Sequence, residues 1–264
     1  MTEQILLTMK PYIYWCSIAL FLLLEHFYSY RPPTVSKLLR GTANISLSLF
    51  NGTIYHLLFT STIVTMLQTS PAKGGGLLHT MTLPDWIEIM LGILVLDFTL
   101  YVWHLLNHVM PLLWRFHRVH HSDMNMDVTT ANRFHLGEFL ISGLIRLVVI
   151  YTFGLSAVAY FLFEILVNIA IQFHHSSLAV NSRFQWLWHY LFVPPFLHRI
   201  HHSVKIKERD SNYGVLFSFW DRMFGTLRTD IAQEGIIIGL GSHRQFNKLG
   251  FGHLMAMPFS RFTI

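Results

Sequence analysis

Five long apolar runs constrain this chain of 264 residues more than any other feature. A helix needs about 20 mainly apolar residues to cross the hydrocarbon core of a bilayer. Runs of roughly that length cover residues 12–30, 44–68, 86–106, 138–153 and 155–173. Only 12% of the residues are charged, about half the share found in soluble domains. The sequence therefore predicts an all-α integral membrane protein with four to five transmembrane or re-entrant helices, and the short run 138–153 is the one that could be tilted or re-entrant.

The region after residue 173 contains no further run of this length, so we expect a helical cap that lies on the polar side of the membrane. The interpretation is one membrane-embedded domain over residues 1–264, with N-terminal spans in 1–85, a histidine-rich region in 86–230 and the end of the cap in 231–264. Arginine and lysine gather in the loops 31–43 and 107–137 and in the tail. The positive-inside rule places these parts in the cytoplasm.

Charge and cysteine content exclude other classes. The net charge is +5, but the basic residues are scattered beside apolar runs, as in membrane-flanking loops, so we expect no nucleic-acid partner. The single cysteine, Cys16, excludes an internal disulfide framework and any four-cysteine zinc or iron–sulfur site.

Histidines are abundant, and ten of the 17 fall in four short groups beside predicted membrane boundaries. The first is HLLNH, the second HRVHH, the third a histidine pair and the fourth HRIHH. Their histidines are His104 and His108; His117, His120 and His121; His174 and His175; and His198, His201 and His202.

The spacing of these histidines favours metal binding. Residues three or four positions apart share one face of a helix, so His104 and His108 can point at one place. In HxxHH we expect the first two histidines to share a face and the third to lie about 100° round the helix, so that one helix serves two neighbouring ions. Imidazole suits zinc, copper, iron and nickel, and eight to ten imidazoles are too many for one ion.

A stripe of polar residues precedes the first histidine pair on the same helix. Asp97, Tyr101, His104 and His108 follow at steps of four, three and four residues. A carboxylate behind a ligating histidine can accept its second N–H and fix the tautomer, which is the role expected for Asp97; the alternative is a polar stripe that faces other helices. His135 is undecided between a ligand, a residue supporting the ligands and a surface residue.

The order HLLNH, WRFHRVHH, FHHSS and HRIHH resembles the fatty acid hydroxylase and sterol desaturase superfamily over roughly residues 85–230, as does SNYG at 211–214 followed by FWDRMFGTLR. The resemblance implies a helical membrane domain with a dinuclear iron centre on the cytoplasmic face, which uses O2 to hydroxylate or desaturate a lipid. It implies as ligands His104, His108, His117, His120, His121, His198, His201 and His202. His175 matches a further family histidine better than His174, which stays a candidate, and Asn212 is a candidate for supporting the ligands.

Electrons for such a reaction must come from a separate reductase, cytochrome b5-like protein or ferredoxin, because the chain carries no glycine-rich dinucleotide fingerprint and no cysteine cluster. The substrate is a sterol, fatty acyl chain, ether lipid or carotenoid. A bacterial inner membrane is favoured over the endoplasmic reticulum. The competing hypotheses are a metal transporter, a multihaem electron carrier and a catalytically inactive metal-binding protein.

Overall fold

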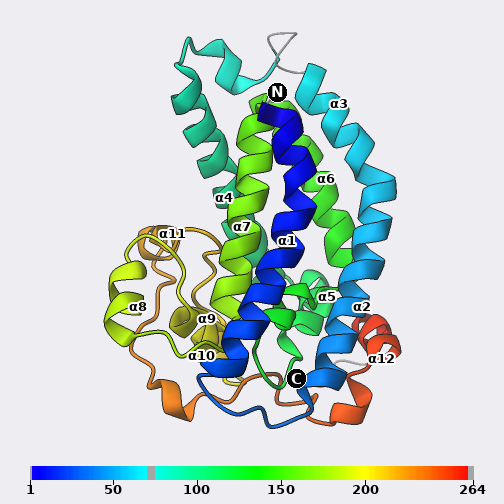
Figure 1. Cartoon of the computed structure of the whole chain (residues 1–264), viewed down its shortest axis with the longest axis vertical. Helices are drawn as coiled ribbons and strands as arrows, with labels where there is room; N and C mark the ends of the chain where they lie inside the picture. Colours follow the sequence, from blue (N-terminus) through cyan, green and yellow to red (C-terminus); the bar gives the residue numbers. More distant parts are fainter. Residues whose placement is uncertain (1, 70–74, 261–264) are drawn as a thin grey trace.

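The computed structural model describes residues 2–69 and 75–260, and helices form its regular structure (Figure 1). Within these residues five helical segments are long and apolar enough to cross a membrane, and β-structure is limited to isolated bridges. The segments are α1 (Thr2–Phe27), α2 with α3 (Lys37–Thr69), α4 (Asp85–Val109), α6 (Leu136–Phe153) and α7 (Ala157–His175). The predicted all-α membrane fold is confirmed.

The second span is one continuous helical segment. Helix α2 (Lys37–Tyr55) passes through a π-helical turn (His56–Thr60) into α3 (Ser61–Thr69). Its polar side chains contact the loop that follows the second histidine group: Asn44 Nδ2 donates to Thr129 Oγ1 at 3.0 Å, and Asn51 Nδ2 donates to the Phe134 carbonyl at 2.7 Å. These bonds fix that loop against the membrane helices.

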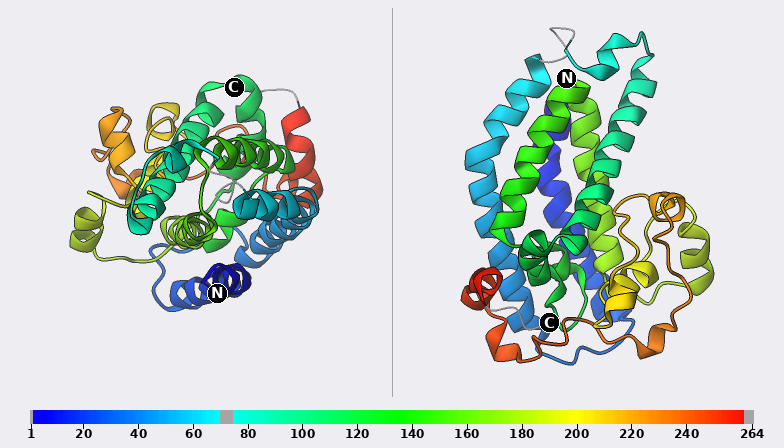
Figure 2. Two further views of the ribbon diagram at one scale, coloured as in Figure 1. Left: turned by 90° about the horizontal axis from the view of Figure 1, so that it is seen from above. Right: turned by 180° about the vertical axis from the view of Figure 1, so that it is seen from behind.

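Helix α7 packs between α1 and α4 in the bundle (Figure 2). Half of its span is buried inside the protein, against only 6% of the span of α1. The main apolar core surrounds α7 and includes Phe59, Leu96, Ile150 and Phe163. Large side chains on the opposite faces, such as Leu144 and Val148 of α6, are exposed and face the lipid.

Helix α6 is a single unbroken helix that packs beside α2, α3 and α4, and it is long and apolar enough to cross a membrane. Gly154 ends it in the left-handed conformation, with φ of 67°. A side chain there would collide with the Gly75 carbonyl oxygen, since a Cβ would lie 2.2 Å from it. Glycine therefore permits the tight connection from α6 to α7.

The first span ends at Phe27, three residues earlier than predicted, because the following residues pair with the segment after α7. Tyr30 N donates to the Ser177 carbonyl at 2.7 Å, and Ala179 N donates to the Tyr28 carbonyl at 2.8 Å. Glu25 strengthens this junction: its buried carboxylate accepts the backbone N–H groups of Val128 and Ser177. The end of α1 thus holds the segments that follow two of the histidine groups.

The remaining helices are short and gather at the histidine end of the bundle. They are α5 (Pro111–His121), α8 (Ser182–Trp188), α9 (Pro195–His201), α10 (Ile206–Arg209), α11 (Phe219–Met223) and α12 (Phe251–Ala256). Short 3-10 turns occupy Leu77–Thr80, Val128–Asn132, Gln233–Gly235, Phe246–Lys248 and Met257–Phe259. Apart from Leu77–Thr80, which lies at the opposite end of the bundle, these helices and turns form the predicted helical cap, although α8 and α11 lie beside the lower half of the bundle rather than below it (Figures 1 and 2).

Candidate metal centre

Nine histidines from four helices converge at one end of the bundle and form two groups. The five-histidine group contains His104, His108, His117, His121 and His201; the four-histidine group contains His120, His175, His198 and His202. In each group one ring nitrogen per residue lies within 4.8 Å of all the others. Two ligands about 2.1 Å from one ion are at most about 4.2 Å apart, so each group is close to the size that one ion requires.

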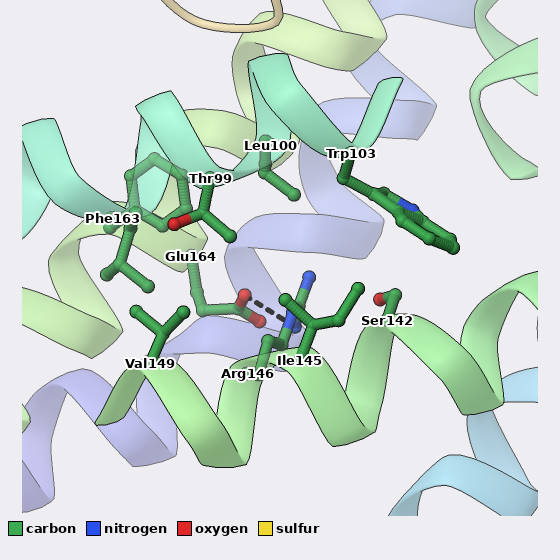
Figure 3. Close-up of a pocket in the computed structure, with 10 residues that line it drawn as sticks. Thr99, Leu100, Trp103, Ser142, Ile145, Arg146, Val149, Phe163 and Glu164 are labelled. Atoms are coloured by element: carbon green, nitrogen blue, oxygen red, sulfur yellow. Dashed lines mark ion pairs between the residues drawn. The ribbon is translucent and has the colours of Figure 1, made fainter. Parts of the chain in front are cut away.

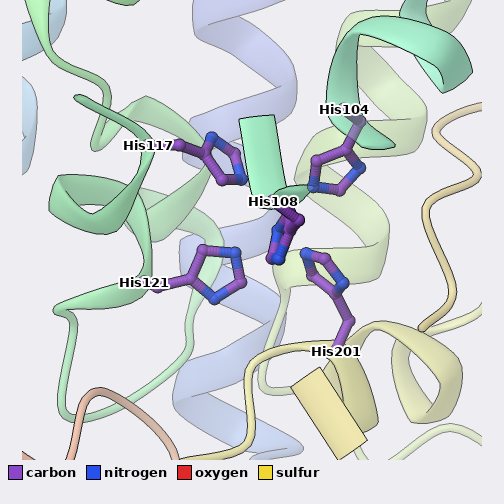
Figure 4. Close-up of side chains that lie close together, drawn as sticks. All are labelled: His104, His108, His117, His121 and His201. Carbon is purple, nitrogen blue, oxygen red and sulfur yellow. The ribbon is translucent and has the colours of Figure 1, made fainter. Parts of the chain in front are cut away.

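The five-histidine group directs its Nε2 atoms inward (Figure 4). Two of the Nδ1 atoms point outward and meet backbone acceptors: His104 Nδ1 lies 2.9 Å from the Tyr213 carbonyl, and His201 Nδ1 lies 2.8 Å from the Ser211 carbonyl. An acceptor on Nδ1 places the proton there and leaves the Nε2 lone pair free for a metal.

Two further Nδ1 atoms meet carboxylates, whereas His121 Nδ1 has no hydrogen-bond partner among the described residues. His117 Nδ1 lies 2.9 Å from Glu138 Oε1, and His108 Nδ1 lies 3.2 Å from Asp210 Oδ1. Within the described residues the Nε2 atoms of His108, His117, His121 and His201 are buried and have no hydrogen-bond partner. Buried polar atoms without partners cost free energy, and a bound cation would satisfy all of them.

Each Nε2 atom of the four-histidine group lies within hydrogen-bonding distance of at least one other Nε2 atom in the group. His175 Nε2 lies 3.0 Å from His120 Nε2 and 2.9 Å from His198 Nε2, while His202 Nε2 lies 3.1 Å from His198 Nε2. Four imidazole nitrogens at such distances need a proton or a cation between them, because their lone pairs otherwise repel. This group therefore also fits a metal ion.

Each HxxHH motif contributes to both groups, but the pairing differs from the prediction. In HRVHH the first and third histidines, His117 and His121, join the five-histidine group and His120 joins the other. In HRIHH, His198 and His202 pair and His201 is separate. The expectation that the first two histidines share a face is wrong because residues four apart are offset by only about 40°, against about 60° for residues three apart.

The two groups are immediate neighbours. The rings of His121 and His202, one from each group, stack at 4.4 Å. All nine imidazoles are shielded from solvent; even His108, which has exposed backbone, has no exposed side-chain surface.

Burial holds the histidines outside the spans in the neutral form that a metal requires. It lowers their pKa well below the ordinary value, and neighbouring histidines lower it further; these residues are His120, His121, His198, His201 and His202.

Two candidate histidines lie outside both groups. His174 is buried with its ring 4.1 Å from that of His198, but its nitrogens are not among the converging atoms. His135 begins α6, where its Nδ1 accepts the Gly137 N–H at 2.9 Å, and its Nε2 lies 3.1 Å from the Met255 carbonyl. The structure therefore places His135 as a helix cap.

Asp97 does not accept a histidine N–H, so the predicted role is wrong. Its carboxylate accepts hydrogen bonds from Leu216 N, Phe217 N and Trp220 Nε1 at 3.1, 3.2 and 2.9 Å. The carboxylate turns away from the histidines because these donors, 119 or more residues later in the chain, surround it. Asp97 thus anchors the loop that follows the fourth histidine motif.

Tyr101 and Asn212 also stabilise this loop rather than contact a metal-facing nitrogen. Tyr101 Oη lies 2.9 Å from Thr226 Oγ1. Asn212, with φ of 55°, donates from Nδ2 to the carbonyls of Leu197 and Arg228 and accepts the Arg228 N–H. Through Leu197 this ties the loop to α9.

Asp221 fixes the backbone that holds His104. Its carboxylate accepts the Tyr213 N–H at 2.7 Å and the Gly214 N–H at 2.8 Å. Burial raises the pKa of Asp221 to about 6, although hydrogen bonds from Thr226, Gly214 and Tyr213 counteract part of this effect. The Tyr213 carbonyl is thereby aimed at His104 Nδ1.

Sequence reasoning missed Glu138 and Asp210. Glu138 lies 21 residues from His117, and Asp210 lies 102 residues from His108, so no local pattern links either pair. The one signal was Glu138 itself, an acidic residue in the first turn of an apolar helix.

A narrow pocket lies between α4, α6 and α7, one turn from the histidines (Figure 3). Its cavity volume is about 10 Å³, close to the minimum for one water molecule. Trp103 and Ser142 line the end near His104 and Glu138. Arg146 and Glu164 line the middle of the pocket and form an ion pair of 2.8 Å (Figure 3).

Comparison with known proteins gives a match to the fatty acid hydroxylase family over residues 89–226, which is more than half of the chain and includes every histidine of both groups. The chain belongs to the fatty acid hydroxylase family. The family is known for iron-dependent oxygenases, and its members include lipid hydroxylases and monooxygenases.

Three relatives of this chain are named for reactions on different lipids. An ornithine lipid hydroxylase from Rhizobium tropici is 29% identical over 69% of this chain and 55% of its own length. Human cholesterol 25-hydroxylase is 29% identical over 54% of this chain and 52% of its own length. An alkylglycerol monooxygenase from Xenopus tropicalis is 29% identical over 59% of this chain and 32% of its own length.

The matched region spans about half of the first two relatives and about a third of the alkylglycerol monooxygenase. No solved structure matches the chain.

Proposed function

We propose that this protein is a membrane-bound, non-haem diiron oxygenase that hydroxylates or desaturates a lipid with O2 and external electrons. The observation that carries the proposal is the convergence of nine buried imidazoles in two adjoining groups, in which the Nε2 atoms of His108, His117, His121 and His201 have no hydrogen-bond partner among the described residues. Family membership supports iron as the metal.

The donor set fits two iron ions. Imidazole nitrogen is a suitable ligand for iron, and we assign one ion to the five-histidine group and one to the four-histidine group. A bound pair of irons would supply the reduction of dioxygen and the oxidation of an unactivated C–H bond. In hydroxylation one oxygen atom enters the lipid and the other leaves as water, with two electrons and two protons from the donor system.

The protein's own residues orient the ligands and exclude water. Glu138 and Asp210 hold Nδ1 of His117 and His108, so both rings keep their orientation. The buried rings and the loop held by Asp221 close the site from solvent, which protects the reaction from side reactions with water.

A lipid substrate is supported by the relatives, whose printed substrates are an ornithine lipid, cholesterol and alkylglycerol. The pocket between α4, α6 and α7, whose lining includes Trp103 next to His104, is the path that we assign to such a lipid. At its present volume the pocket must widen to admit a hydrocarbon chain.

Electrons come from a separate reductase, cytochrome b5-like protein or ferredoxin that approaches the histidine end. We assign this end to the cytoplasm because the loops 31–43 and 107–137 and the tail carry most of the basic residues. The bacterial ornithine lipid hydroxylase supports a bacterial inner membrane as the location.

The test expresses the protein in a host that lacks it and compares the lipids formed under ordinary and isotopically labelled dioxygen. The proposal predicts a lipid that gains one labelled oxygen atom or loses two hydrogen atoms, and purified protein with roughly two iron ions per chain. A metal-free protein with full lipid-oxidising activity would contradict it, as would metal uptake into sealed vesicles with no oxidised lipid.

A further inference from the structure

The segment that contains α11 packs against the side of a membrane span. Asp97 accepts its three hydrogen bonds from this segment, and the Phe98 ring contacts those of Trp220 and Phe224 at centroid distances of 4.9 and 5.8 Å. Asp97 lies 12 residues before Val109, the last residue of α4, which is about 18 Å along the helix. The segment therefore lies beside the middle of the span, well short of the level where α4 ends.

Helix α8 belongs to the same unit. The Phe192 and Phe217 rings stack at 5.5 Å, Ser218 Oγ donates to the His189 carbonyl at 2.5 Å, and Arg222 Nη1 donates to the Tyr190 carbonyl at 3.1 Å. We call residues 182–192 and 215–224 the lateral lobe. Figures 1 and 2 show α8 and α11 beside the histidine half of the bundle.

The outer surface of the lateral lobe is apolar and aromatic. Leu187 and Met223 are 71% and 66% exposed, and further exposed side chains are Phe184, Trp186, Tyr190, Leu191 and Phe224. A water-facing cap would leave this surface in contact with solvent at a large cost. The lipid-facing side of α4 continues directly onto this surface through Phe98, which is itself partly exposed.

Basic residues accompany these aromatic side chains. Arg183 and Arg222 are exposed on the lobe, and Ser182, Arg183, Trp186 and Leu187 line a shallow groove along α8. Aromatic rings at the membrane–water boundary together with arginines that reach phosphate groups are typical of segments that lie in a bilayer interface.

We propose that the lateral lobe is inserted into the phospholipid leaflet on the histidine side of the membrane, with Leu187, Met223 and Phe224 among the acyl chains and Arg183 at the phosphates. This differs from the sequence-based expectation of a cap that lies wholly on the polar side. The inference depends on the packing of the lobe against α4 and not on any bound metal.

The test attaches an environment-sensitive fluorophore to single cysteines in a Cys16→Ser background, which removes the only native cysteine. Leu187→Cys, Tyr190→Cys and Met223→Cys probe the lobe. Leu144→Cys is the lipid-facing control, since Leu144 is 58% exposed in the middle of α6. Glu234→Cys is the water-facing control, because Glu234 is exposed in the cap.

The purified chain is reconstituted alone into phosphatidylcholine vesicles with and without lipids that carry a quencher on the acyl chain. We expect quenching of about twofold or more at the lobe positions and at Leu144→Cys, and almost none at Glu234→Cys. Three lobe positions ensure that a misfolded variant does not decide the result. Lobe fluorescence that behaves like Glu234→Cys would overturn the proposal and would favour a protein partner on this surface.

Discussion

At the residue scale, each of the nine imidazoles belongs to one of the two histidine groups, so single substitutions test the groups separately. His120→Ala removes one ligand from the four-histidine group, and His201→Ala removes one from the five-histidine group. We expect each variant to lose at least half of the bound iron and to lower lipid oxidation by about 100-fold or more, since ligands matter more than the outer partners that contribute 10–100-fold. His26→Ala, at an exposed position, is the control and should retain both, as measured by iron analysis and product formation.

Glu138 tests whether the outer partner of His117 matters for metal binding. Glu138→Ala removes the acceptor 2.9 Å from His117 Nδ1, and we expect iron affinity to fall about 10–100-fold. Glu138→Gln keeps an amide oxygen at this position, so its affinity should lie between those of Glu138→Ala and the native protein. Equal iron affinity in all three proteins, measured by competition with a chelator, would show that this bond does not orient the ring.

Asp97 has a structural role that can be tested separately from catalysis. Asp97→Ala leaves three donors of the lateral lobe without their acceptor, and each unsatisfied buried donor costs about 1–3 kcal/mol. We expect the thermal unfolding midpoint to fall by several degrees. Thr99→Ala, two residues away, should change it little, because Thr99 Oγ1 donates to the Val95 carbonyl of its own helix and does not bind the lateral lobe among the described residues. An unchanged midpoint in Asp97→Ala would contradict the anchoring role.

At the element scale, α6 presents two faces with different predicted roles. Ile145 lines the pocket between α4, α6 and α7, while its neighbour Leu144 faces the lipid. Ile145→Trp should lower kcat/KM for the lipid by about tenfold or more through steric filling of the pocket, with iron content unchanged. Leu144→Trp is the matched control; comparable loss of activity in both variants would mean that the pocket does not lead substrate to the histidines.

The sequence predicted the elements better than their contacts. Apolar length alone located all five spans, because a bilayer sets the length of a crossing helix. The four histidine groups contained the nine converging residues together with His174, which is not among them. The partner of Asp97 could not be predicted, because the donors belong to a loop more than 100 residues away. The same holds for Asp210 and His108, which only the folded chain brings within 3.2 Å. The predicted pairing within HxxHH was wrong for a local reason. The motif permits pairing of histidines three or four residues apart, and helix geometry favours those four apart.

At the scale of the whole molecule, the buried histidines predict how stability depends on pH. Burial lowers the pKa of His120, His121, His198, His201 and His202 in the folded protein, whereas the unfolded chain titrates near 6.5. The unfolded state therefore binds more protons as the pH falls below about 6.5, so the stability present above that pH is lost on acidification.

Metal binding shifts stability in the same direction, because protons compete with the metal for imidazole. We expect the thermal midpoint of the metal-free protein to fall steadily below about pH 6.5 and iron to dissociate over the same range with uptake of more than one proton. A midpoint that is constant or rises on acidification through this range would contradict the neutral, buried state of these rings.

The central claim is that the two histidine groups each hold one iron ion, side by side, at one end of the bundle. Anomalous X-ray diffraction at the iron absorption edge, from crystals of the iron-loaded protein, tests it most directly. The account predicts two peaks, one among His104, His108, His117, His121 and His201 and the other among His120, His175, His198 and His202. A single peak, peaks outside both groups, or no peak in protein that oxidises lipid would contradict it.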